Sequence, residues 1–263
     1  MGFKCGIVGL PNVGKSTLFN ALTASKNAEA ANFPFCTIDP NIGIVDVIDT
    51  RLDKLTELSK SKKKIYTNIT FVDIAGLVKG ASKGEGLGNK FLSHIREVDA
   101  IIHLVRCFES DKITHVNSKI NPVEDLETIK TEIILSDIDI IQKKLEKGKK
   151  KLLEEKQIKI LEEKLNQLNE GKEISVDDID EKKFLSSLGL LSIKPKIIVC
   201  NVDEGSLANG NTFTEEVQKK YSYEKVVTIC ADIEDQIMGL DNNEREIFMK
   251  EIGLNKTGLN QLI

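Results

Sequence analysis

Nine consecutive residues near the amino terminus have the types and spacing of a phosphate-binding loop. The segment from Gly9 to Thr17, GLPNVGKST, matches the pattern G-x-x-x-x-G-K-[ST]. It lies between the apolar run 5–9, which predicts a strand, and the helix-like stretch STLFNAL. Its glycines allow successive backbone N–H groups to turn inward, and the N-terminus of the following helix adds positive potential. We therefore predict that this loop binds the phosphates of a nucleotide.

Charged and hydroxyl side chains in and beyond this loop predict a magnesium site. Lys15 would supply a point charge to the β- and γ-phosphates, and the Ser16 hydroxyl is placed to ligate Mg²⁺. Asp73 ends the β-like run ITFVD, where a carboxylate reaches Mg²⁺ through water, and Gly76 would offer its N–H to the γ-phosphate. Thr37, in the loop NFPFCT, is expected to close on Mg²⁺ as a switch residue, with an ordinary turn residue as the alternative.

The base-recognition position, after the strand-like run KIIVC, departs from the guanine-binding motif N-K-x-D. It reads NVDE at 201–204, so Val202 replaces the lysine and the longer Glu204 replaces the aspartate. Adenine has no donor at N1 and no 2-amino group for such a carboxylate, whereas Asn201 can serve its N6 and N7. We predict that ATP is preferred to GTP, with GTP left open because Glu204 can still reach guanine. The expected nucleotide-binding residues are Asn12, Val13, Gly14, Lys15, Ser16, Thr17, Gly76, Asn201, Val202, Glu204, Cys230 and Ala231.

The residue that would orient the attacking water is not in its usual place. A glutamine often follows D-x-x-G, whereas this chain has Leu77, which cannot orient water. Of the three histidines, His115 lies in the polar loop 109–119, and we predict that it is catalytic, with a plain surface histidine as the alternative. Asn12 could coordinate a monovalent cation, and K⁺ there would supply positive charge near the phosphates.

The elements that hold these residues are predicted by the spacing of apolar side chains. Short apolar runs, each followed by a polar loop and helix-like spacing, predict an α/β fold with a mostly parallel sheet and helices on both faces. From 127 to 170, isoleucine and leucine recur at helical or heptad intervals among lysine and glutamate, which predicts an inserted hairpin of two antiparallel helices. The predicted domains are 1–126 with 192–263, and an inserted helical domain at 127–191. The runs are 5–9, 69–73, 100–105, 196–200 and 226–231.

The composition narrows the classes of partner and compartment. The 263-residue chain has 37 Lys plus Arg against 41 Asp plus Glu, so no global cationic field indicates nucleic acid or an anionic membrane. Its five cysteines form no C-x-x-C pair, and no apolar run approaches the length of a membrane span. We expect a cytoplasmic protein with reduced thiols and with no membrane partner and no specific DNA partner.

Several segments together resemble the YchF or Obg-like ATPase family, and the resemblance covers nearly the whole chain. They are GLPNVGKST, NFPFCTIDPN, DIAGLVKGASKGEGLGN, DAIIHLVRCFES, NVDE and EIGLNKTGLNQLI. The resemblance implies a Ras-like P-loop domain with a coiled-coil hairpin, ATP hydrolysis in preference to GTP and association with ribosomes, and it matches His115 to the family's proposed catalytic histidine. The family continues into a small C-terminal TGS domain, whereas this chain ends at Ile263, so we expect a shortened form with weaker ribosome or RNA binding.

Three functions are compatible with these residues. The first is an ATP-hydrolysing switch whose two states are read by the ribosome or a translation partner. The second is a GTP-specific enzyme of the Obg type, against which Val202 and Glu204 argue. The third is a nucleotide-gated binding module with vestigial hydrolysis and the helical hairpin as its working surface. We expect the first.

Overall fold

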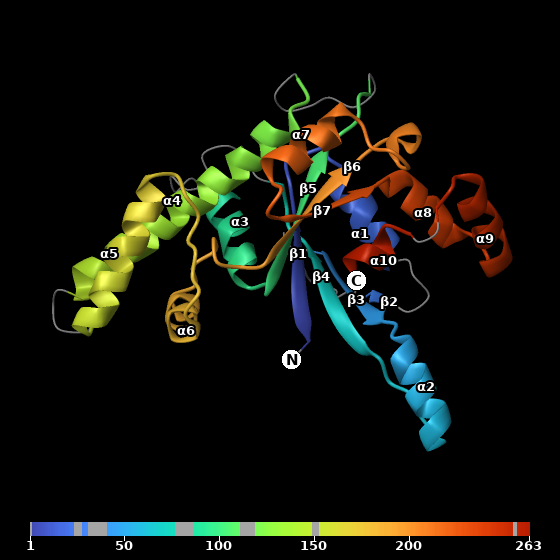
Figure 1. Cartoon of the computed structure of the whole chain (residues 1–263), viewed down its shortest axis with the longest axis horizontal. Coiled ribbons are helices and arrows are strands. Elements are labelled where there is room, and N and C mark those ends of the chain that lie inside the picture. Colours follow the sequence, from blue (N-terminus) through green and yellow to red (C-terminus); the bar gives the residue numbers. More distant parts are fainter. Residues whose placement is uncertain are drawn as a thin grey trace.

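A sheet of seven strands forms the centre of the protein (Figure 1). The computed structural model describes residues 2–23, 28–30, 41–76, 87–110, 119–148, 153–254 and 257–263. The strands lie in the order β2-β3-β4-β1-β5-β6-β7, and β4, β1, β5, β6 and β7 are parallel. This confirms the predicted mostly parallel sheet. The strands are β1 (Phe3–Val8), β2 (Ala28–Ala30), β3 (Asn41–Val47), β4 (Thr67–Asp73), β5 (Ala100–Arg106), β6 (Lys196–Asn201) and β7 (Lys225–Ile229).

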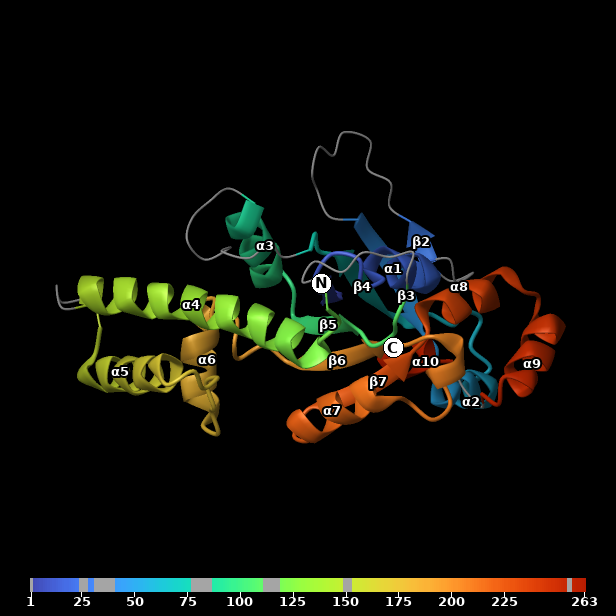
Figure 2. The same ribbon diagram turned by 90° about the horizontal axis from the view of Figure 1, so that it is seen from above.

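Helices cover both faces of this sheet: α1 packs with α8 on one face, whereas α4 packs with α7 on the other, next to α3 (Figures 1 and 2). Every residue of the central strand β5 is buried, as expected for a parallel strand covered on both faces. None of the helices in the described ranges is both long enough and apolar enough to span a lipid bilayer. The helices are α1 (Lys15–Thr23), α2 (Thr50–Ser59), α3 (Leu87–Arg96), α4 (Pro122–Gly148), α5 (Glu155–Asn169), α6 (Ile179–Ser187), α7 (Thr212–Lys220), α8 (Ala231–Gly239), α9 (Asn242–Glu251) and α10 (Leu259–Leu262).

The antiparallel edge of the sheet was not predicted. Strand β3 runs antiparallel to β4, and β2 runs antiparallel to β3. The β3 sequence, NIGIVDV, mixes polar and glycine residues into a short apolar run, so its pattern is weaker than that of the central strands. Helix α2 follows directly, and its N-cap Asp49 accepts a hydrogen bond from the Arg51 N–H.

The predicted pair of helices corresponds to α4 and α5, which pack against each other (Figures 1 and 2). Helix α4 begins at Pro122, before the predicted boundary at 127, and runs without a break through it. Its early residues Leu126 and Ile129 belong to the cores around the sheet, whereas Ile141 packs in a separate cluster with Leu161 of α5. The division into two domains and the coiled-coil character of the pair stay predictions.

Buried Asp137 joins α4 to the segment that returns the chain to the sheet. Its carboxylate accepts hydrogen bonds from the Leu191 N–H at 2.9 Å and from the Ser192 hydroxyl at 2.6 Å. The Asp137 side chain is fully buried, so these donors would lose their partner if it were removed. This contact holds α4 in a defined position relative to β6.

Candidate functional site

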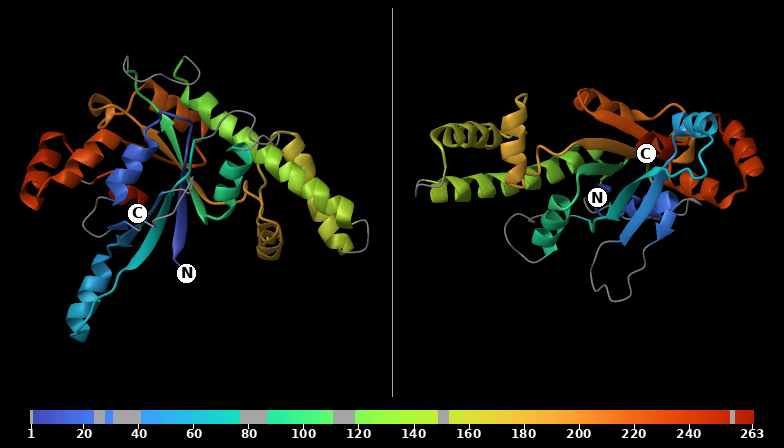
Figure 3. Two further views of the ribbon diagram at one scale, coloured as in Figure 1. Left: turned by 180° about the vertical axis from the view of Figure 1, so that it is seen from behind. Right: turned by 90° about the horizontal axis from the view of Figure 1, so that it is seen from below.

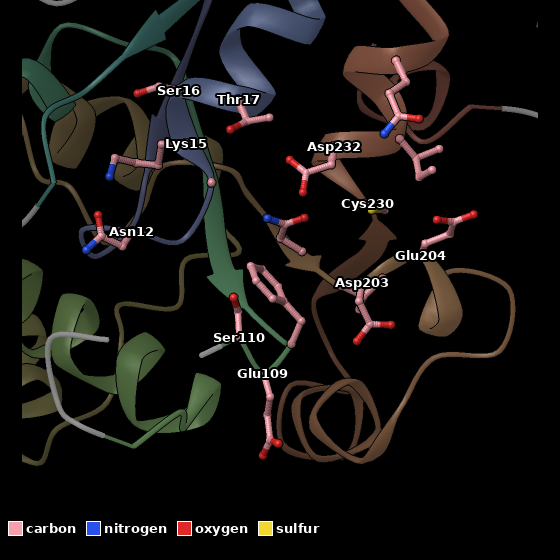
Figure 4. Close-up of a pocket in the computed structure, with 16 residues that line it drawn as sticks. Asn12, Lys15, Ser16, Thr17, Glu109, Ser110, Asp203, Glu204, Cys230 and Asp232 are labelled. Atoms are coloured by element: carbon pink, nitrogen blue, oxygen red, sulfur yellow. The ribbon is translucent and has the colours of Figure 1, made fainter. Parts of the chain in front are cut away.

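A cavity of about 670 Å³ opens at the carboxyl ends of the parallel strands (Figure 4). Its wall is formed by the loop after β1, the segments after β5 and β6 and the beginning of α8. This edge is where ligands bind in open α/β sheets. Nine of the predicted nucleotide-binding residues line the cavity: Asn12, Gly14, Lys15, Ser16, Thr17, Asn201, Val202, Glu204 and Cys230.

The loop after β1 has the backbone of a phosphate cradle. Asn12 and Gly14 both have left-handed φ angles, +64° and +97°. A Cβ on Gly14 would lie 2.4 Å from Asn201 Nδ2, and one on Gly9 would lie 2.5 Å from the Leu104 carbonyl oxygen. Helix α1 begins at Lys15, and its first three residues line the cavity, so the unpaired N–H groups of the helix N-terminus lie beside it. Both glycines of the motif are therefore required by close approach.

The predicted phosphate and magnesium residues lie together beside this cradle. Lys15 Nζ donates a hydrogen bond to the Leu10 carbonyl oxygen at 3.1 Å, and the Ser16 hydroxyl donates to the Asp73 carboxylate at 3.3 Å. Burial lowers the pKa of Lys15 and the nearby charge of Asp73 opposes that shift. Gly76 is also close, because a Cβ there would lie 3.1 Å from Lys15 Nζ. Four residues predicted from separate motifs thus meet at one place.

The chemistry of these groups fits Mg²⁺. A hydroxyl and a carboxylate are hard oxygen ligands, and Mg²⁺ in phosphate sites is held by few protein groups together with water and phosphate oxygens. Burial raises the pKa of Asp73, while Lys15, Ser16 and Asn41 act in the opposite direction. No group of three or more metal-binding side chains occurs in the ranges that the structure covers. P-loop folds of this kind generally use Mg²⁺.

Asn201 is a bridge between the phosphate loop and the base end of the cavity. Its Nδ2 donates to the Val13 carbonyl oxygen at 3.0 Å, and its Oδ1 accepts from the Ala231 N–H at 2.9 Å. All three side chains are almost fully buried, so Val13 and Ala231 can offer only main-chain atoms to a nucleotide. The predicted direct contact of Asn201 with adenine stays a prediction. The structure adds a positioning role that the motif does not show.

Acidic side chains gather at the end of the cavity away from Lys15. Asp203, Glu204 and Asp232 line it there (Figure 4), and the Asp203 carboxylate accepts from the Ser206 N–H at 2.9 Å. The Val202 side chain is buried in the core, so it does not cover a base as a lysine would. The lining residues that were not predicted are Phe108, Glu109, Ser110, Asp203, Asp232, Ile233 and Gln236.

The sequence contained one signal for the unpredicted residues after β5. Phe108 follows a fully buried strand, and the ends of parallel strands meet at the same edge of the sheet. The Arg106 guanidinium carbon lies 4.7 Å from the centre of the Phe108 ring, which holds the ring at the cavity wall. Phe108 is therefore the aromatic side chain of the described residues placed to meet a base.

Two predicted site residues and the glutamine position lie outside the described residues. These are Thr37, His115 and Leu77, and their roles stay predictions. His103 is buried in β5, where burial lowers its pKa to about 3.

Comparison with known proteins identifies close relatives. The family described as "50S ribosome-binding GTPase" matches residues 4–141. The protein named "Ribosome-binding ATPase YchF" of Bacillus subtilis is 48% identical over all of this chain, which covers 75% of that protein. Its namesake in Escherichia coli O157:H7 is 49% identical over all of this chain and 74% of that protein. The solved structure titled "Structure of the Schizosaccharomyces pombe YchF GTPase" superposes with a TM-score of 0.83 at 34% identity, over 99% of this chain and 74% of that one.

Proposed function

The chain belongs to the YchF family of P-loop proteins, and on this basis we propose that it is a Mg²⁺-dependent ATPase that acts as a ribosome-binding switch in the cytoplasm. The observation that carries the proposal is the convergence of Lys15, Ser16 and Asp73 beside one cavity. Ribosome binding is supported by the names of the bacterial relatives. Those names say ATPase, whereas the matched family and the fission-yeast structure are called GTPases, so the base must be decided from the residues.

The phosphates are assigned to the loop end of the cavity. Lys15 and the amide groups from Gly9 to Thr17 bind the β- and γ-phosphates, and the N-terminus of α1 adds positive potential. Ser16 and Asp73 hold Mg²⁺, which supplies neutralisation of charge on the phosphate oxygens. Asn201 keeps this loop at a set distance from the β7–α8 connection, so that phosphate and base can be bound together.

The base is assigned to the acidic end of the cavity. Asp232 opens α8, next to the main chain that Asn201 holds. Its carboxylate accepts hydrogen bonds, so it suits the N6 amino group of adenine and opposes the O6 acceptor of guanine. Asp203 already accepts from the Ser206 N–H, and Glu204 and Asp232 are both exposed, so the proposal rests on Asp232, rather than Glu204, meeting the edge of the base. Phe108 offers a ring face for stacking.

We expect Mg²⁺ complexes of non-hydrolysable ATP analogues to bind at least about tenfold more tightly than the GTP analogues, because an unmatched polar pair costs more than 1 kcal/mol. Asp232→Asn should narrow this ratio, since the amide can also donate to guanine O6. Asp235→Asn is the matched control, because Asp235 is exposed on the same helix and does not line the cavity. Isothermal titration measures all of these affinities, and a tenfold preference for GTP would overturn the assignment.

We also propose that His115 orients the attacking water, that Thr37 closes on Mg²⁺ and that K⁺ binds near Asn12. The proposal is supported by Leu77, which cannot orient water, and by the place of Asn12 at the cavity wall. His115→Ala should lower kcat by about 100-fold and leave the affinity for ATP analogues unchanged. Hydrolysis should also be faster in KCl than in NaCl at equal ionic strength. An equal kcat for His115→Ala and the unchanged protein would exclude the proposed role of His115 in orienting water.

A further inference from the structure

Helix α2 carries large apolar side chains that no described part of the chain covers. Leu55 and Leu58 are 60% and 82% exposed, and residues three apart lie on the same face of a helix. The apolar face of a surface helix normally packs on the core, yet α2 has no buried residue. The helix extends away from the sheet, beyond the ends of β3 and β4 (Figures 1 and 3). This face is therefore available to another molecule.

A hollow lies at the base of the same helix. Its volume is about 440 Å³, and it is lined by Val47, Leu52, Leu55 and Thr67 together with the ion pair of Asp49 and Arg51. Leu55 thus belongs both to the wall of the hollow and to the exposed face. Leu52, Leu55 and Leu58 follow one ridge of the helix, which extends the apolar surface from the hollow toward the helix end. A large apolar side chain of a partner fits such a hollow.

The same region has a positive charge that contrasts with the rest of the protein. Residues 50–66 contain six basic and two acidic residues, a net charge of +4, whereas the whole chain has a net charge of −4. Asp53 is engaged by Lys64 at 2.7 Å and by the Tyr66 hydroxyl at 2.7 Å. The remaining lysines are exposed, one within the helix and three at its C-cap and in the turn after it. They are Lys54, Lys60, Lys62 and Lys63.

We propose that this surface docks an acidic, amphipathic protein helix. We call it the α2 surface, and it consists of Leu55 and Leu58 with the four exposed lysines. The lysines complement acidic side chains, and the leucines with the hollow complement the apolar face of a helix laid against them. RNA would also meet the lysines, but its phosphates gain nothing from exposed leucines, and surfaces that bind single-stranded RNA without sequence preference use aromatic stacking. The α2 surface is separate from the nucleotide cavity, so the proposal stands or fails independently of the ATPase activity.

The test uses the full chain and a synthetic fluorescent peptide with leucines on one face of a helix and glutamates on the other. We expect saturable binding with a Kd on the order of 10 μM by fluorescence anisotropy. The double substitution Leu55→Asp with Leu58→Asp should weaken binding at least tenfold, because it removes the apolar contact and adds repulsion. Lys62→Glu with Lys63→Glu should also weaken it and should reduce its dependence on salt.

Two controls make the result specific. Ile247→Asp changes an isoleucine that is 59% exposed on α9, away from the α2 surface, and should leave peptide affinity unchanged. The affinity of every variant for a nucleotide analogue should equal that of the unchanged protein, which shows that the fold is intact. The proposal would be overturned if the peptide showed no saturable binding, or if its affinity were the same for the leucine variant and the unchanged protein. Binding of poly(U) RNA that is lost in the lysine variant and kept in the leucine variant would also overturn the proposal. So would a dimer of the unchanged protein, detected by analytical ultracentrifugation, that becomes a monomer in the leucine variant.

Discussion

Lys15→Ala is expected to lower the rate of ATP hydrolysis by at least about 1000-fold. The reason is that the Lys15 ammonium would no longer stabilise the negative charge of the γ-phosphate oxygens in the transition state. The structure places the ammonium of Lys15 at the Leu10 carbonyl oxygen, with Asp73 and Gly76 beside it. No neighbouring helix in the described ranges brings another lysine to line this cavity. Multiple-turnover phosphate release measures the effect, with nucleotide affinity measured in parallel.

The matched control is Lys90→Ala, since Lys90 is exposed on α3 and does not line the cavity. Its rate should equal that of the unchanged protein. An unchanged rate in Lys15→Ala would mean that the activity comes from a contaminant. Absence of multiple turnover in the unchanged protein, with tight nucleotide binding retained, would instead favour the nucleotide-gated binding module.

Gly14→Ala is expected to weaken nucleotide binding by about 1000-fold through backbone strain and a collision with Asn201. Gly14 has φ +97°, and an added Cβ would lie 2.4 Å from Asn201 Nδ2. Asn201 would have to move, and its hydrogen bonds to Val13 and Ala231 would break together. Left-handed strain and two unpaired buried groups together cost about 4 kcal/mol, which corresponds to this loss. Titration with a fluorescent nucleotide measures it.

Gly171→Ala is a control that distinguishes the effect of left-handed backbone strain from the effect of the collision with Asn201 in Gly14→Ala. Gly171, after α5, also has a left-handed φ of +74°, but nothing lies within 4 Å of the position of its Cβ. This variant should lose about 1 kcal/mol of the free energy of unfolding and should keep full nucleotide affinity. Urea denaturation and the same nucleotide titration provide the two measurements. Equal loss of affinity in both variants would show that the collision with Asn201 is not the cause.

The phosphate half of the site could be predicted because its information is local. A strand, a glycine-rich turn and a helix start occupy consecutive residues, so the pattern around Lys15 contains its own geometry. Asp73 was placed by the same logic, since it ends a strand that pairs with β1. The alternation of apolar runs likewise predicts the parallel sheet. The edge strands β2 and β3 were missed because polar and glycine residues dilute their pattern and antiparallel pairing sets their place.

The base half of the site depended on contacts between residues far apart in the chain. Asn201 bonds to Val13 across 188 positions, and no spacing rule connects such residues before the strands are ordered in a sheet. Phe108 and Asp232 became cavity residues only because β5 and β7 end at the same edge as the phosphate loop. Sequence motifs therefore predicted the groups that we propose to bind phosphate and metal, because Lys15 and Ser16 share one local motif and Asp73 ends a strand with a motif of its own. Tertiary packing decided which acceptors and which ring line the end of the cavity to which we assign the base, because those groups follow separate strands.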